Sequence, residues 1–321
     1  MKSLIVECGY RVHVNSVDLN GNRGRCCGGI GFALEEPQLK LRVEIGRRAG
    51  LDTPHMEQVR EYLAQLSTVE QLKHPVFVQQ ISGVRPHIGL GSLTQLKLAI
   101  LAAIRAAKGD DVTESSIPTG LGIAATSGIG LGAFLYGGFV ADGGYKVTSS
   151  APKTINGEME GNPPPIIFRS EMPPEWRVVL AIPANNSSLS GMAEQSFFEK
   201  ITPIPEEEIN LLSREVLLSV MPAVKERDIE SLRQSLQRVC RLGSKPFEEG
   251  LHSRTAAVLD SMRARFNFAS VSSLGPTCFS LTEITSGLAG ELNSLETEHP
   301  DYVWSISPIR NRPFSVQFER V

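Results

Sequence analysis

A glycine turn that runs directly into an apolar helix is the feature that most constrains the fold of this chain. The turn is Gly89-Leu90-Gly91-Ser92, and residues 93–108 carry apolar side chains at helical spacing up to Gly109. Glycines let the backbone approach a phosphate closely, and free N–H groups at a helix start attract the anion. Ser92 and Gln95 also fit a capping box, in which both side chains satisfy donors at the helix end. The pattern predicts a phosphate cradle, a capped helix start, or both.

Two further turns combine glycines with hydroxyl side chains in the same way. One covers residues 126–130 and the other residues 272–277, and each alone is compatible with an ordinary turn. Three such turns in one chain predict a large polyanionic ligand such as a diphosphate. The residues predicted to bind its phosphates are Gly89, Gly91, Ser92, Thr94, Gln95, Thr126, Ser127, Gly128, Gly130, Ser273, Gly275 and Thr277.

A cluster of polar and basic residues near the N-terminus suggests a substrate site. Arg11 and His13 are two residues apart in a predicted strand, so they lie on the same face of it. Arginine grips a carboxylate or a phosphate by a two-pronged contact. The predicted substrate-binding residues are Arg11, His13, Asn20, Arg23 and Arg25, with a solvated surface loop as the alternative.

Two acidic residues are the candidates for catalysis. Asp18 lies in the same early segment, and Asp142 ends an apolar run and precedes Gly143 and Gly144. The oxygens of the Asp142 carboxylate suit Mg²⁺ or a ribose hydroxyl. Asp-Gly is equally the commonest hairpin signal, so a structural turn is the alternative. The sequence leaves open which residues contact a metal ion.

The chain is long enough for two domains with a cleft between them. At 321 residues it exceeds the size at which a single hydrophobic core stops growing. Residues 157–174 hold two proline clusters and are predicted to form a nonhelical linker. We place the boundary near Phe168, which gives domains at residues 1–167 and 168–321. The predicted strands are residues 4–6, 10–14, 39–45, 76–78 and 177–182, and the predicted helices are residues 93–108, 229–240 and 251–266.

Composition and charge exclude several classes of protein. Charged residues make up 21% and hydrophobic residues 41%, which argues against disorder, and the net charge of -3 lacks the basic excess of a nucleic-acid binder. Apolar runs are too short to span a bilayer and no signal-peptide pattern is seen, so we expect a cytoplasmic protein without a membrane partner. The five cysteines form no Cys-x-x-Cys pair and are expected to be reduced, with Cys26 and Cys27 as a redox pair the alternative.

Taken together, these segments resemble the GHMP superfamily of small-molecule kinases. The early strand with Asp18 is similar to its first motif, residues 86–92 to its second and residues 272–277 to its third. Closer still is the resemblance to the β-ribofuranosylaminobenzene 5′-phosphate synthase family, a branch that is not a kinase. The short matches that carry it are Arg11-Val12-His13, Asp18-Leu19-Asn20-Gly21, Gly28-Gly29-Ile30-Gly31 with Leu34-Glu35-Glu36-Pro37, Gly89-Leu90-Gly91-Ser92 with Thr94-Gln95, Thr126-Ser127-Gly128-Ile129-Gly130, Gly138-Phe139 with Asp142-Gly143-Gly144, Leu189-Ser190-Gly191 and Ser272-Ser273 with Gly275-Pro276-Thr277.

The resemblance implies a fold and a reaction. The fold is α+β with two domains, an N-terminal one like ribosomal protein S5 and a C-terminal ferredoxin-like one. The reaction joins phosphoribosyl diphosphate to an aromatic carboxylic acid through a new carbon–carbon bond at ribose C1, and it releases CO₂ and diphosphate. Mg²⁺ and helix-end N–H groups are expected to stabilise the departing diphosphate. Because loss of CO₂ replaces loss of a proton, no strong general base is required. A homodimer is compatible with the resemblance.

The departures from the family pattern concern the acceptor. Gly122-Ile123-Ala124-Ala125 stands where the family usually has Gly-Arg-Gly-Gly, and Ala269-Ser270-Val271 precedes Ser272 where Gly-Gln is frequent. Leu274 replaces a frequent aromatic residue. A missing arginine favours a different acceptor, such as the pyrazole carboxylate used by relatives that make C-nucleoside antibiotics of the formycin and pyrazofurin type. The other expected acceptors are 4-aminobenzoate and 4-hydroxybenzoate, as in methanopterin biosynthesis.

Two other classes of function fit the same motifs. In an ATP-dependent GHMP kinase, residues 89–92 would wrap the ATP phosphates, and Asp142 or Asp18 would orient an acceptor hydroxyl. Formation of ADP would identify that class. A non-catalytic binding protein would hold its ligand tightly without turnover, which the density of polar loop residues disfavours.

Overall fold

The first sheet is built around one long hairpin. In a computed structural model that describes residues 2–46, 48–147, 162–185 and 192–319, β1 (Lys2–Asp18) and β2 (Arg25–Ile45) pair along most of their length. The strand order is β12-β1-β2-β4-β3, with β5 and β6 also pairing with β2 and β7 pairing with β5. The remaining strands are β3 (Gly50–Asp52), β4 (Val76–Ser82), β5 (Phe139–Asp142), β6 (Tyr145–Lys146), β7 (Ile166–Ser170) and β12 (Ser315–Phe318).

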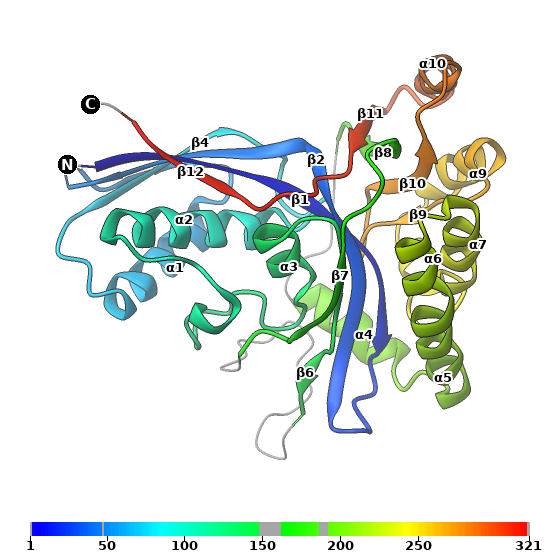
Figure 1. The fold of residues 1–321 in the computed structure, drawn as a ribbon, viewed down its shortest axis with the longest axis horizontal. Helices are drawn as coiled ribbons and strands as arrows, with labels where there is room; N and C mark the ends of the chain where they lie inside the picture. The colour runs from blue at the N-terminus through cyan, green and yellow to red at the C-terminus, as the bar shows by residue number, and fades with distance from the viewer. Residues whose placement is uncertain (1, 47, 148–161, 186–191, 320–321) are drawn as a thin grey trace.

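The helices of the first half cover one side of this sheet (Figure 1). They are α1 (Met56–Val69), α2 (Ser92–Lys108) and α3 (Ile129–Leu135), with the short η1 (Glu114–Ser116) between the last two. Eleven residues of α2 are buried, because its apolar residues surround most of the helix rather than one stripe. The 85–92 loop therefore enters a helix that is fixed in the core, which makes its first turn a rigid platform.

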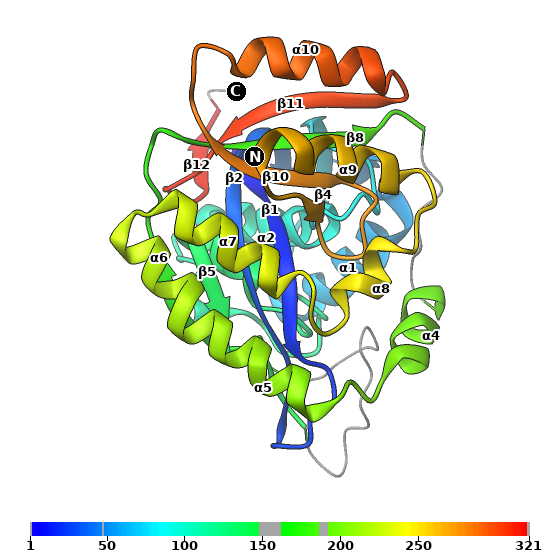
Figure 2. The ribbon, with the colours of Figure 1, turned by 90° about the vertical axis from the view of Figure 1, so that its right-hand side faces the viewer.

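The second sheet has the order β11-β8-β10-β9 and a helical layer on one side (Figure 2). Its strands are β8 (Trp176–Pro183), β9 (Ser270–Val271), β10 (Cys278–Glu283) and β11 (Tyr302–Pro308). The helices of the second half of the chain are α4 (Met192–Ile201), α5 (Glu206–Glu215), α6 (Met221–Glu226), α7 (Ile229–Val239), α8 (Lys245–Glu249), α9 (Thr255–Phe266) and α10 (Leu288–Glu298), and a π-helical turn, η2 (Val216–Val220), joins α5 to α6.

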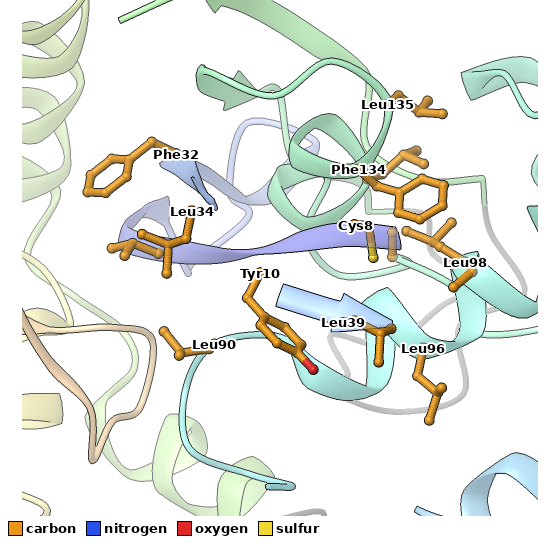
Figure 3. Packing of buried hydrophobic residues seen from close by; sticks show 14 of the residues in the cluster. Cys8, Tyr10, Phe32, Leu34, Leu39, Leu90, Leu96, Leu98, Phe134 and Leu135 are labelled. Carbon is orange, nitrogen blue, oxygen red and sulfur yellow. The ribbon is translucent and has the colours of Figure 1, made fainter. Parts of the chain in front are cut away.

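One hydrophobic core joins the two sheets. Its largest cluster contains Phe32 of β2 and Phe279 of β10, whose rings meet edge to face at 5.9 Å between centroids. The ring of Phe268 also meets that of Phe279 edge to face, with 5.6 Å between centroids. Figure 3 shows the part of this core in which Tyr10 and Cys8 of β1 lie near α2 and α3. The strands that carry the candidate site residues are thus anchored from both halves of the chain.

Most of the predicted elements are confirmed, and three need correction. The predicted strands lie within β1, β2, β4 and β8, and the first two predicted helices match α2 and α7, the latter capped by the Asp228 side chain at 3.0 Å from the Ser231 nitrogen. The last helix begins at Thr255, not at residue 251, and the predicted linker contains β7 where residues 162–174 are described. The capping box is wrong, as shown below.

The division into domains at residue 168 stays a prediction. The strand β7 crosses that position and pairs with β5, and β12 returns from the C-terminal end to pair with β1. All five cysteines are unpaired, as expected, with the sulfurs of Cys26 and Cys27 3.8 Å apart. Among the described residues, none of the helices combines the length and apolarity needed to cross a bilayer.

Replacing Phe279 by alanine tests the shared core. Because this side chain has no exposed surface and contacts aromatic rings from both halves, we expect Phe279→Ala to lower the free energy of unfolding by about 3–5 kcal/mol. The measurement is urea denaturation followed by circular dichroism. Phe318→Ala is the matched control, since 59% of that side chain is exposed, and its effect should stay within about 0.5 kcal/mol. Equal effects of the two substitutions would contradict a core that spans both sheets.

Candidate functional site

The main candidate site is a cavity of about 520 Å³ at the start of α2. It lies where segments of the first half of the chain meet segments of the second half, and ligand sites are common at such junctions. Its lining comes from β1, the 85–92 loop and α2, the 122–130 segment, α4 and the 272–277 loop. The lining residues are Arg11, His13, Ser16, Leu19, Cys27, Gln58, His87, Leu93, Thr94, Gly122, Ala124, Ala125, Thr126, Ser127, Gly130, Glu194, Phe198 and Ser273.

Two irregularities in the β1–β2 hairpin direct side chains into the cavity. The register shifts between Gly9 and Arg11 and again between His13 and Asn15, and such bulges re-aim side chains relative to a regular strand. Arg11 and His13 both line the cavity, as their spacing on one strand face predicted. The hairpin thus presents a guanidinium and an imidazole side by side.

Arg11 carries the positive charge of this wall. Its removal from water lowers the pKa of Arg11 to about 10, and the charge of Glu194 partly offsets this effect. The guanidinium therefore stays protonated at neutral pH. It donates a hydrogen bond to the Gly89 carbonyl oxygen, and a Cβ at Gly91 would lie only 3.1–3.2 Å from the guanidinium atoms Nε and Cζ. Gly91 also has a φ of 74°, so the close approach and the left-handed backbone both require glycine.

His13 is neutral in the folded protein. Burial lowers the pKa of His13 well below its usual 6.5, and the positive charges of Arg11 and Lys245 lower it further. Within the described part of the chain, its buried Nδ1 has no hydrogen-bond partner. An imidazole in this state can both donate and accept a hydrogen bond to a bound molecule.

The 89–92 and 272–277 loops lie against each other although they are far apart in the sequence. A Cβ at Gly89 would lie 2.3 Å from the Ser272 carbonyl oxygen and 3.0 Å from that of Gly275. The Ser272 hydroxyl donates to the Gly89 carbonyl oxygen at 2.8 Å and accepts from the backbone nitrogen of His13 at 3.1 Å. The Ser273 nitrogen donates to the His13 oxygen at 2.9 Å. Both loops and β1 therefore form one connected wall.

The start of α2 differs from the predicted capping box. Gly91 is the N-cap residue and no side chain caps the helix, while Ser92 is already its first helical residue. The Gln95 side chain donates instead to the Gly130 carbonyl oxygen at 2.8 Å, because the 126–130 loop packs directly against this turn. The first N–H groups of α2 consequently keep the capacity to bind an anion.

Asp142 holds the 126–130 loop by hydrogen bonds and does not line the main cavity. Its carboxylate accepts hydrogen bonds from the nitrogens of Gly128 at 2.9 Å and Gly144 at 2.8 Å, and from the Ser127 hydroxyl at 3.4 Å. Burial raises the pKa of Asp142 to about 6, and these hydrogen bonds oppose the rise. The contact with the Gly144 nitrogen is that of a structural turn, the alternative noted for Asp142, although β5 and β6, which flank this turn, pair with β2 and not with each other. A catalytic role of Asp142 stays a prediction.

The other early candidates lie on the opposite side of the hairpin or in its turn. The Asp18 carboxylate accepts from the nitrogens of Asn20 at 2.7 Å and Gly21 at 3.1 Å, and Asn20 is buried against the backbone of Ile204. Arg25 donates to the carbonyl oxygens of Gly143 and Gly144, and Arg23 forms an exposed ion pair with Glu206. Asp18, Asp142, Arg23 and Arg25 line a second cavity of about 380 Å³. Cys27 lines both cavities.

The predicted phosphate-binding residues divide into two groups. Thr94, Thr126, Ser127, Gly130 and Ser273 line the main cavity. The others support it: Gly89, Gly91, Ser92 and Gln95 shape the start of α2, Gly128 binds Asp142, and Gly275 and Thr277 hold the 272–277 loop against Gly89 and Ile88. Their contact with a phosphate stays a prediction.

Several lining residues were not predicted from the sequence. Glu194 and Phe198 come from α4, and the apolar side chains of Leu19, Ala125 and Phe198 belong to one buried cluster. Seven described residues other than glycine have a left-handed backbone, and four of them, Cys27, His87, Ala124 and Ser273, line the cavity. Strained backbone of this kind is concentrated at functional sites, but the residue types do not predict which positions adopt it.

Solved structures show which class of fold surrounds this cavity. Homoserine kinase from Cytophaga hutchinsonii superposes with a TM-score of 0.71 over 98% of this chain and 97% of its own, at 14% identity. Mevalonate diphosphate decarboxylase from Staphylococcus aureus gives a TM-score of 0.61 over 98% of both chains, at 12% identity. The protein has the α+β fold of the GHMP kinases, as predicted.

Comparison with curated sequences identifies the family. The chain is 34% identical over 296 residues to β-ribofuranosylphenol 5′-phosphate synthase of Methanothermobacter thermautotrophicus, which covers 88% of this chain and 90% of the relative. The Archaeoglobus fulgidus protein of the same name is 31% identical, over 86% of this chain and 87% of its own. No family model matches the chain. The chain belongs to the β-ribofuranosylphenol 5′-phosphate synthase family, which confirms an enzyme of the C-ribosyltransferase kind.

The anchoring role of Asp142 predicts a specific pH dependence of stability. A folded pKa of about 6, above the usual 3.8, means that the stability contributed by the protonated carboxyl is lost as the pH rises from about 4 through 6. We expect the free energy of unfolding of the natural protein to fall, relative to that of Asp142→Asn, by at most about 3 kcal/mol over this range. Denaturant titrations at several pH values measure it, and parallel curves for the two proteins would contradict it.

Proposed function

We propose that this enzyme joins the ribosyl phosphate of phosphoribosyl diphosphate to an aromatic carboxylic acid, with release of CO₂ and diphosphate. The observation that carries the proposal is the meeting of three glycine and hydroxyl loops around one cavity, at an uncapped helix start and beside Arg11. This arrangement suits a donor with several phosphate groups. The names of the family members support the ribosyl phosphate product.

The donor end of the cavity would bind the diphosphate. As the bond from ribose C1 to diphosphate breaks, negative charge grows on the leaving group. The first N–H groups of α2, the Arg11 guanidinium and the hydroxyls of Thr94 and Ser127 are fixed in place before the reaction and would stabilise that charge. Fixed donors need no reorganisation during bond breaking, which is why they lower the barrier.

The residues of the cavity fit a magnesium ion that arrives with the diphosphate. Magnesium is commonly held by one or two carboxylates together with substrate phosphates, and Glu194 is the carboxylate among the described residues that line the main cavity. Glu194 would hold the ion there, and the ion would neutralise charge on the leaving diphosphate. The described residues contain no group of three or more His, Cys, Asp and Glu side chains that could hold a metal without the substrate.

The apolar side of the cavity would hold the acceptor ring. Leu19, Ala125 and Phe198 form a wall on which a flat aromatic molecule can pack. The ring carbon that bears the carboxylate would attack ribose C1, and the electrons of the bond to CO₂ would restore the aromatic ring as CO₂ leaves. His13, which is neutral, would orient the acceptor by a hydrogen bond.

The acceptor that we propose first is 4-hydroxybenzoate. The product named for the relatives is a ribosyl phenol, which this acid would give on loss of CO₂. One observation supports a second candidate, a pyrazole carboxylate. The departures at Ala124 and Ala125 lie in the cavity wall, so the wall carries two methyl groups where the family pattern has glycines. A smaller ring would suit a wall narrowed in this way, and 4-aminobenzoate is the third candidate.

A product assay tests the proposed reaction. The protein, Mg²⁺ and phosphoribosyl diphosphate are incubated separately with 4-hydroxybenzoate, 4-aminobenzoate and 4-aminopyrazole-3,5-dicarboxylate, and mass spectrometry follows CO₂ and diphosphate. We expect equal molar release of both with one acceptor. A parallel incubation with ATP and the same acids is the control. Formation of ADP without CO₂ would contradict the proposal and support a kinase.

Substitution of Arg11 tests the donor end. Arg11→Met removes the cation and keeps much of the apolar stem, so we expect the KM for phosphoribosyl diphosphate to rise about ten- to hundredfold, as for lost hydrogen bonds to a charged group. The KM for the acceptor should change far less. Arg60→Met, at an exposed position of α1, is the matched control. An unchanged KM in a folded Arg11→Met protein would exclude Arg11 from the donor site.

A further inference from the structure

Lys245 is a fully buried cation at the beginning of α8, outside every glycine loop. Its ammonium group has three donors and three acceptors: the Glu248 carboxylate, the Val271 carbonyl oxygen at 3.2 Å and the Ser273 carbonyl oxygen at 3.2 Å. Glu248 also accepts from the Ser244 hydroxyl at 2.6 Å. Burying an ammonium group costs several kcal/mol before its partners offset the loss of water. A well-packed apolar pair would give the core the same volume without this cost.

The carbonyl groups that Lys245 holds belong to the segment that forms the cavity wall. Ser273 has a left-handed backbone with φ of 55° and lines the cavity, so its conformation needs support from its surroundings. The same residue donates its N–H to the His13 oxygen, and the neighbouring Ser272 binds both His13 and Gly89. Loss of Lys245 would therefore alter the positions of β1 and the start of α2, because Ser272 and Ser273 connect them by hydrogen bonds.

The positive charge of the Lys245 ammonium group also acts on His13 in the cavity wall. The positive charge of Lys245 is one of the causes that lower the pKa of His13, together with burial and Arg11. The charge therefore acts on a side chain of the cavity wall, although Lys245 itself has no exposed surface.

We propose that Lys245 is a positioning residue of the anion site: it holds the Val271 and Ser273 carbonyl groups so that the 272–277 loop, His13 and Gly89 keep the geometry that binds diphosphate. This inference rests on the proposed function of the main cavity. The buried ion pair of Lys245 and Glu248 would then contribute to substrate affinity. An ion pair that only stabilises the core would have no such role.

A double substitution separates the two roles. In Lys245→Met/Glu248→Met no unpaired charge is left in the core, so we expect the protein to stay folded. Its melting temperature should fall moderately, because the Ser244 hydroxyl and two carbonyl groups each lose a hydrogen-bond partner. The loop carbonyl groups lose their partner, and we expect the Kd for inorganic diphosphate with Mg²⁺, measured by calorimetry, to rise on the order of ten- to hundredfold. The KM for phosphoribosyl diphosphate should rise in parallel, and the KM for the acceptor should change less than threefold.

The controls keep each outcome distinct. Arg105→Met/Glu70→Met removes another ion pair, at the far end of α2, and should leave the Kd for diphosphate unchanged. Unchanged affinity in the folded Lys245→Met/Glu248→Met protein would overturn the positioning role while leaving the proposed function intact. Natural protein that binds no diphosphate would overturn both. If the double variant does not fold, Lys245→Met/Glu248→Gln, which leaves no buried charge and keeps an acceptor for the Ser244 hydroxyl, is measured and read in the same way.

Discussion

The hydrogen bonds of the Ser272 hydroxyl connect the parts of the site. This single group donates to the Gly89 carbonyl oxygen and accepts from the His13 nitrogen, across sequence separations of 183 and 259 residues. The contact exists only because Gly89 has no side chain, since a Cβ there would lie 2.3 Å from the Ser272 carbonyl oxygen. The uncapped start of α2, the β1 wall and the 272–277 loop keep their relative positions through it. The edge-to-face rings of Phe32 and Phe279 stabilise the same junction from within the core.

Local sequence patterns predicted the elements well, because their causes are local. The helical spacing of apolar residues after Ser92 and the cap at Asp228 depend on neighbours in the chain. The helix α7 begins at the predicted residue, and α2 begins one residue earlier than predicted. The capping box failed for a tertiary reason. Gln95 binds Gly130 of a different loop, and no property of residues 92–95 alone reveals that partner. Likewise, β7 forms in a proline-rich stretch because β5 offers it an edge.

The sequence predicted the residues of the candidate site less completely than it predicted the helices and strands. Spacing placed Arg11 and His13 on one face, and hydroxyl and glycine patterns selected Thr94, Ser127 and Ser273, which the fold brings to one cavity. The same reasoning could not separate the two sides of the hairpin. Asp18 and Asp142 are both acids that precede glycines by a few residues, yet their carboxylates bind backbone nitrogens and line a second cavity. The contributions of Phe198 and Lys245 depend on how the second half of the chain packs, which sequence spacing does not encode.

We propose that the donor binds in the main cavity and that the residues of the second cavity, beyond Cys27, hold the walls of the first in place. A crystal structure of the protein with phosphoribosyl diphosphate and Mg²⁺ shows directly where the donor binds. We expect the diphosphate at the first turn of α2, within hydrogen-bonding distance of Arg11 and Thr94. A diphosphate bound instead beside Asp18 and Arg25 in the second cavity would contradict it.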